Sequence, residues 1–145
     1  MASSYTSSFV EVVKNRDKVA EITFVITANA GDGVVTAIST DAGNIKYPVQ
    51  TYTELIRGRS LKMVEAFPTV GGTAPDAADV TVKDSDGLDL LNGGGVNLIH
   101  ATAKKSIYPL ISAQAATIPI RGALTIGVSN QTAASANFTL RLTFI

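Results

Sequence analysis

Hydrophobic and polar residues alternate along much of the chain with a period of two. In residues 20–28 every even position is apolar, while the odd positions carry a mixture of polar and apolar residues. Residues 138–144 follow the same pattern more strictly, and residues 124–129 repeat it. Because successive side chains of a strand point to opposite faces, each segment is predicted to be a strand with one face on a hydrophobic core. Shorter runs that predict further strands lie at residues 9–13, 34–38, 61–67, 80–83 and 106–111.

Turn-forming residues separate these runs at the spacing of hairpins. The clearest of them lie at residues 29–33, 41–44 and 86–87. This spacing, together with many β-branched residues, predicts an all-β fold, an antiparallel β-sandwich or jelly-roll-like barrel of about eight strands. We expect one domain over residues 9–145, preceded by a flexible N-terminal arm of residues 1–8, which are small and polar. The final strand is expected to be tied into a sheet.

One segment is ambiguous between a helix and a strand. Thr53 can cap a helix over residues 53–57, but Gly58 interrupts such a helix within a turn, at a cost of about 1 kcal/mol relative to alanine. We therefore favour a bent strand that continues into residues 61–67, and keep the short helix as the alternative.

Composition narrows the possible functions. The chain has 145 residues, 12 Lys and Arg, 12 Asp and Glu, one His, and no Cys or Trp. Zero net charge argues against nucleic acid as a partner, and the lack of cysteine excludes a disulfide scaffold, a thiol enzyme and a thiolate zinc site. His100 is the sole imidazole, and no G-x-S-x-G motif accompanies it, so we expect no catalytic residue and no cofactor. No apolar run approaches the ~20 residues of a membrane span and no signal peptide is evident, so no membrane partner is expected.

Asp84, Asp86 and Asp89 form the most suggestive local motif. Closely spaced carboxylates around a glycine can bind calcium. The match to a helix–loop–helix calcium loop is partial, because Asp89 occupies the position that requires glycine and Gly95 the position that requires glutamate. Asp86 and Gly87 also lie between two apolar runs, as in a hairpin turn. We favour the turn, expect no metal, and keep these three aspartates as weak calcium candidates.

Charged residues gather in separate parts of the chain. Separated basic and acidic surfaces on a neutral protein suit contact with copies of itself or with one fixed partner. The candidate interface residues are Tyr5 and Phe9 near the N-terminus, the basic Arg57, Arg59 and Lys62, and the acidic Asp76 and Asp79.

The order of several short motifs resembles small structural proteins of tailed bacteriophages. The chain shows an early Ile-Thr-Phe strand, a Gly-Thr-Ala-Pro loop, Asp-Val-Thr-Val, then Asp-Ser-Asp-Gly-Leu-Asp-Leu-Leu, and a glycine-rich loop. It closes with Leu-Thr-Ile-Gly-Val-Ser-Asn and an alternating last strand. Ala123 stands where the pattern has proline, and residues 40–56 match no part of it. The pieces lie at residues 21–26, 72–75, 79–82, 84–91, 92–97, 122–130 and 137–145.

This resemblance implies a virion component, most like a capsid decoration or cement protein. Such a protein is not an enzyme; it binds the outer capsid surface, bridges neighbouring copies of the major capsid protein, and is often a homo-trimer or dimer. It is assembled in the host cytoplasm, and its N-terminal arm orders on docking. A tail or head-to-tail connector component and a host-surface binding module are the alternatives, and a hydrolase is a distant fourth.

Overall fold

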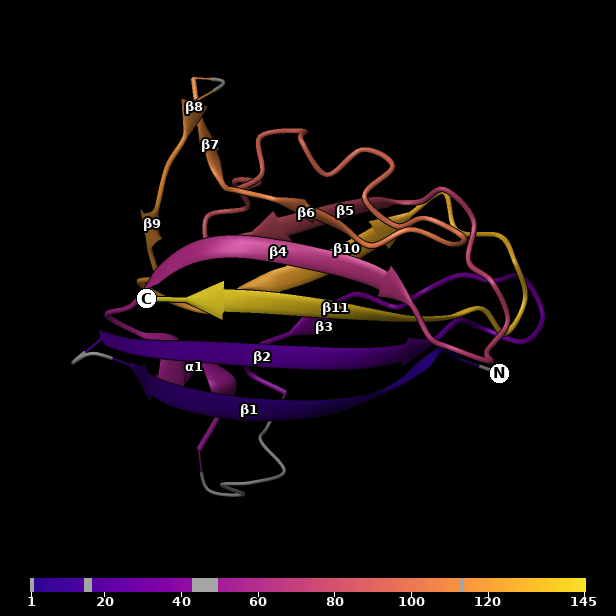
Figure 1. Ribbon diagram of the computed structural model, residues 1–145, viewed down its shortest axis with the longest axis horizontal. Helices are drawn as coiled ribbons and strands as arrows, with labels where there is room; N and C mark the ends of the chain where they lie inside the picture. Colours follow the sequence, from indigo (N-terminus) through magenta and orange to yellow (C-terminus); the bar gives the residue numbers. More distant parts are fainter. Residues whose placement is uncertain (1, 15–16, 43–49, 113) are drawn as a thin grey trace.

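The computed structural model describes residues 2–14, 17–42, 50–112 and 114–145 (Figure 1). These residues form eleven strands and one short helix. No helix among them has the length and apolar character that a bilayer span demands. The elements are β1 (Ser4–Lys14), β2 (Asp17–Thr27), β3 (Ile38–Ser39), α1 (Tyr52–Ile56), β4 (Ser60–Pro68), β5 (Asp79–Lys83), β6 (Lys105–Ile107), β7 (Leu110–Ile111), β8 (Gln114–Ala115), β9 (Ile118–Pro119), β10 (Thr125–Ser129) and β11 (Asn137–Phe144).

Two antiparallel sheets make the sandwich. The larger sheet has the strand order β1-β2-β11-β4-β6, with β9 also paired to β4, and the smaller has the order β3-β10-β5. A separate two-stranded ribbon, β7 with β8, projects from the end of the molecule opposite β1 (Figure 1). The predicted all-β antiparallel class is confirmed, but the predicted count of about eight strands is too low, because several strands are only two or three residues long.

The core lies between the two sheets and follows the alternating pattern of the sequence. Ile22 and Phe24 of β2 pair with Leu142 and Leu140 of the central strand β11, and all four are fully buried. Across from them the smaller sheet contributes Val80 and Val82 of β5 and Ile126 of β10. The prediction that the C-terminal strand is tied into a sheet is confirmed, because β11 pairs with β2 on one side and β4 on the other.

The expectation of a flexible arm over residues 1–8 is wrong for residues 4–8. These residues belong to β1, and Tyr5 lies opposite Ile26 of β2. The Tyr5 ring also packs edge-on against Phe24, with ring centroids 5.8 Å apart. Small polar residues obscured this strand in the sequence, since an edge strand with few buried side chains needs little apolar alternation.

The expectation of a bent strand at residues 53–57 is also wrong, because α1 forms there. The Thr51 hydroxyl accepts a hydrogen bond from the Glu54 N–H at 3.3 Å, so the N-cap is Thr51 rather than Thr53. Tyr52 and Ile56 lie four residues apart on one helix face, and both are buried. Gly58 has φ +84°, the left-handed conformation that ends a helix, so it follows α1 rather than interrupting it.

The turn at residues 29–33 forms, but it does not join a hairpin. Of the expected strand at 34–38 only Ile38 enters a sheet, where it and the following Ser39 pair with β10 rather than β2. Gly33 explains the departure, because a Cβ there would lie 2.3 Å from the Thr132 carbonyl carbon. After β2 the chain therefore leaves the larger sheet and packs against the loop that contains Thr132. The predicted turn at 41–44 lies partly outside the described residues.

Candidate functional site

The Asp84–Asp89 segment is a turn held together by its own carboxylates. The N–H groups of Asp86 and Leu88 donate to Asp84 Oδ1 at 3.0 and 2.9 Å. Gly87 supplies the positive φ, +85°, that the turn requires. The turn predicted at Asp86 and Gly87 is therefore confirmed.

Asp89 performs the same task on the other side of the turn. Its Oδ1 accepts from the N–H groups of Val82 and Leu91, both at 3.1 Å, and its Oδ2 accepts from the Gly93 N–H at 3.0 Å. Among the described residues, no three His, Cys, Asp or Glu side chains lie together as a metal ion would require. The structure thus uses Asp84 and Asp89 to satisfy backbone donors and does not gather them with Asp86 around a calcium position.

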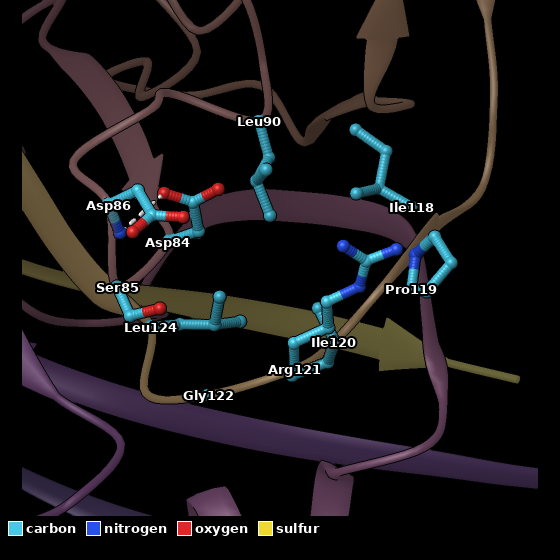
Figure 2. A pocket seen from close by; sticks show the side chains of 10 residues that line it. All are labelled: Asp84, Ser85, Asp86, Leu90, Ile118, Pro119, Ile120, Arg121, Gly122 and Leu124. Carbon is cyan, nitrogen blue, oxygen red and sulfur yellow. Dashed lines mark hydrogen bonds between the residues drawn. The ribbon is translucent and has the colours of Figure 1, made fainter.

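A hollow of about 260 Å³ opens beside this turn (Figure 2). The carboxylates of Asp84 and Asp86 lie at one side of it, and the guanidinium of Arg121 lies at the other (Figure 2). The lining residues in between are mainly apolar and include Leu90 and Leu124. These described lining residues include no imidazole or thiol. The hollow therefore has acidic groups at one side, a basic group at the other and apolar side chains between them.

A second hollow of about 310 Å³ lies next to the first and shares Asp84, Leu90 and Ile118 with it. Its other wall belongs to the projecting ribbon, here called the arm (residues 108–112 and 114–117, which include β7 and β8). Leu88 and Ile111 line this hollow and are both strongly exposed.

Sequence reasoning missed this part of the molecule. Tyr108 is exposed as well, beside a third hollow that it shares with Lys62. We call Leu88, Tyr108 and Ile111 the arm surface. The run at 106–111 predicted one short strand, and nothing in its pattern indicated that the chain would leave the sheet after residue 107.

The two acidic candidate residues bind loops of their own chain. Asp76 Oδ2 accepts from the Thr132 hydroxyl at 2.7 Å and from the N–H groups of Thr132 and Ala133 at 2.8 Å. These hydrogen bonds, the Thr132 hydroxyl first, lower the pKa of Asp76 below its ordinary value because they stabilise the ionised carboxylate. Asp76 thus fixes the loop between β10 and β11.

Asp79 at the start of β5 connects two further loops. Its Oδ1 accepts from the Asn97 N–H at 2.8 Å, and its Oδ2 accepts from the Asn130 side-chain amide at 2.7 Å. Like Asp76, Asp79 has hydrogen-bonding partners inside the molecule, and its carboxylate holds two loops together.

The three basic candidates do not act alike. Arg59 forms an ion pair with Glu11 of β1, and its Nε donates to the Leu55 carbonyl at 3.3 Å. Arg57 and Lys62 are exposed. The structure therefore uses Arg59 to attach β1 to the segment after α1 and leaves Arg57 and Lys62 on the surface.

The N-terminal candidates lie on β1, at the edge of the larger sheet. Phe9 is 7% exposed and belongs to the core, opposite Ile22, so its side chain offers no contact surface. Tyr5 is partly exposed. Three valines of the same strand are also exposed, Val10 and Val12 on the outer face of the sheet and Val13 on the other face, and we call them the edge surface.

His100 acts as a turn cap. Its Nδ1 accepts from the N–H groups of Thr102 and Ala103 at 3.1 and 3.0 Å. The Thr102 hydroxyl also lies 3.4 Å from this nitrogen, so His100 holds the turn that follows it.

Comparison with known proteins identified no relative: no protein-family model, no curated protein and no solved structure matches this chain.

Proposed function

We propose that this chain is a non-enzymatic virion structural protein that decorates the outside of a bacteriophage capsid and stabilises it by bridging neighbouring subunits. The sequence supports the proposal through the ordered motifs that resemble phage structural proteins. The geometry supports it through one observation, the placement of two exposed apolar surfaces at opposite edges of one rigid domain.

The edge surface and the arm surface are separated by the full width of the larger sheet. β1 is the first strand in the sheet order, β6 is the last, and the arm follows β6 directly (Figure 1). Exposed apolar side chains that gather in one region of a domain are typical of sites of protein contact. A domain with one such surface at each edge can bind two neighbours at once, and repetition over a lattice multiplies modest contacts into strong attachment.

Copy number in purified particles tests the proposal. Quantitative mass spectrometry of virions from the source of this sequence should find the chain in numbers comparable with the major capsid protein. A number that fits a single ring would replace capsid decoration with the tail or head-to-tail connector role. Absence from the particles would overturn the virion proposal and favour a binding module that acts elsewhere.

A further inference from the structure

The outer edge of β1 is long and carries few features that prevent strand pairing. β1 has eleven residues, and among the described residues its backbone pairs with β2 alone. Edge strands are usually protected by proline, bulges, shortness or a central charge. β1 contains no proline or glycine, its register with β2 is unbroken, and its one central charge, Glu11, is paired with Arg59.

We propose that β1 pairs antiparallel with β1 of a second copy across a two-fold axis at Phe9, which joins the larger sheets of two copies into one. The axis stands perpendicular to the sheet, so each face of one copy continues into the same face of the other. This inference is independent of whether the chain is a virion component.

Side-chain chemistry favours a second copy in this register. All eleven residues of β1 find a partner, and Val13 lies opposite Tyr5 of the second copy, an aromatic and β-branched pair of the kind that stabilises sheets. Val12 lies opposite Thr6, and both positions belong to the outer face of the sheet. Val12, Val13 and the exposed Tyr5 thereby gain contacts.

Charge also selects the register. With the axis at Phe9, Glu11 faces Ser7 of the second copy, whereas an axis at Glu11 would place two glutamates directly opposite each other, which is unfavourable. The chain as a whole has no net charge, so two copies approach without long-range repulsion.

The pairing is extensive enough to hold a dimer. Eleven antiparallel pairs form about ten hydrogen bonds, the number found in a typical protein–protein interface. Because the same strand is used by both copies, the contact is self-complementary and closes at two subunits. The structure therefore favours the dimer over the trimer that sequence resemblance left open.

Solution mass tests the dimer. Light scattering after size exclusion should give twice the 15.1 kDa of the chain, with dissociation on dilution. Val10→Lys places an opposite charge beside Glu21 on β2 but puts two lysines diagonally beside the axis, so the dissociation constant should rise about tenfold or more. The melting temperature should be unchanged at a concentration where both proteins are monomeric. Val25→Lys is the matched control: this valine is 41% exposed, against 48% for Val10, on the same face but one strand inward, and the variant should remain dimeric.

Cross-linking tests the register. The chain has no cysteine, so Thr6→Cys and Val12→Cys proteins can be mixed and oxidised without background. The mixture should yield a disulfide-linked dimer of one variant with the other, in preference to links between identical variants. A wild-type protein that stays at 15.1 kDa would overturn the proposal and leave the edge to a strand of another protein. A dimer that Val10→Lys does not weaken would also overturn it, because β1 would then lie outside the interface.

Discussion

At the scale of single residues, the carboxylates hold loops in place. Asp76, Asp79, Asp84 and Asp89 each accept at least one backbone N–H from a turn or a loop. Loops outside the sheets leave many backbone donors without a ladder partner, and a carboxylate satisfies them with strong, charge-assisted bonds. In a sequence, an acidic residue that accepts such bonds looks the same as one that binds a partner or a metal. For this reason calcium was kept as a weak alternative to the favoured turn at Asp84, Asp86 and Asp89.

Asp76 allows this role to be tested by pH. Its folded pKa is depressed by the Thr132 and Ala133 donors, so the stabilisation is present above the unfolded value of about 3.9 and is lost as the pH falls through the folded pKa. Asp76→Asn should lower the melting temperature at neutral pH. The difference in melting temperature between this variant and the wild type should become smaller below about pH 4.

The control for this experiment is Asp86→Asn. The Asp86 carboxylate accepts no hydrogen bond from the described residues, so this variant should follow the wild-type melting curve at every pH. A constant difference between Asp76→Asn and wild type down to strongly acidic pH would show that the Asp76 carboxylate is not stabilised by these donors.

At the scale of elements, strands with one strictly buried face were predictable and those held by distant contacts were not. β2 and β11 carry apolar residues at every second position, because the pleat of a strand places every second side chain on the buried face. A short stretch of sequence is enough to show this pattern. β3 and β9 are each two residues long. β3 forms only where the chain passes β10, and β9 only where it passes β4, so neither strand has a local sequence pattern that predicts its length and partner. The helix α1 was kept only as the alternative to a bent strand, since a glycine such as Gly58 marks the end of a helix as well as a break in one.

The central position of β11 makes it the most sensitive element. Leu142 is fully buried between β2 and β4, so Leu142→Ala should lower the free energy of unfolding by about 2–5 kcal/mol, measured by chemical denaturation. Thr143→Val, next to it on the opposite face, is the control: the hydroxyl is buried without a partner among the described residues, so this change should be neutral or stabilising. A loss from Thr143→Val equal to that from Leu142→Ala would show that β11 does not separate a core face from an outer face.

At the scale of the whole molecule, the proposed function depends on where the edge surface and the arm surface lie relative to one another. The order of strands in the larger sheet places β1 and the arm at opposite edges, although Tyr5 and Tyr108 give no such indication in the sequence. Strand order depends on long-range pairing, here β11 inserted between β2 and β4, and a single sequence does not display it. None of the seven candidate interface residues belongs to the edge surface or the arm surface, and the placement of these two surfaces was not predictable from the sequence.

If the two surfaces bind different neighbours, they are separable by mutation. Ile111 is 55% exposed in the arm, so Ile111→Asp should change the free energy of unfolding by no more than about 0.5 kcal/mol and should leave the β1 dimer intact. The same variant should bind capsids assembled without this chain about tenfold more weakly or worse in a pelleting assay, because loss of an apolar anchor at a contact costs this much. Val34→Asp, at a valine that is 53% exposed in a loop outside both surfaces, should bind like wild type. Equal binding by Ile111→Asp and wild type would remove the arm from the capsid contact, and bridging by this domain would then require another surface.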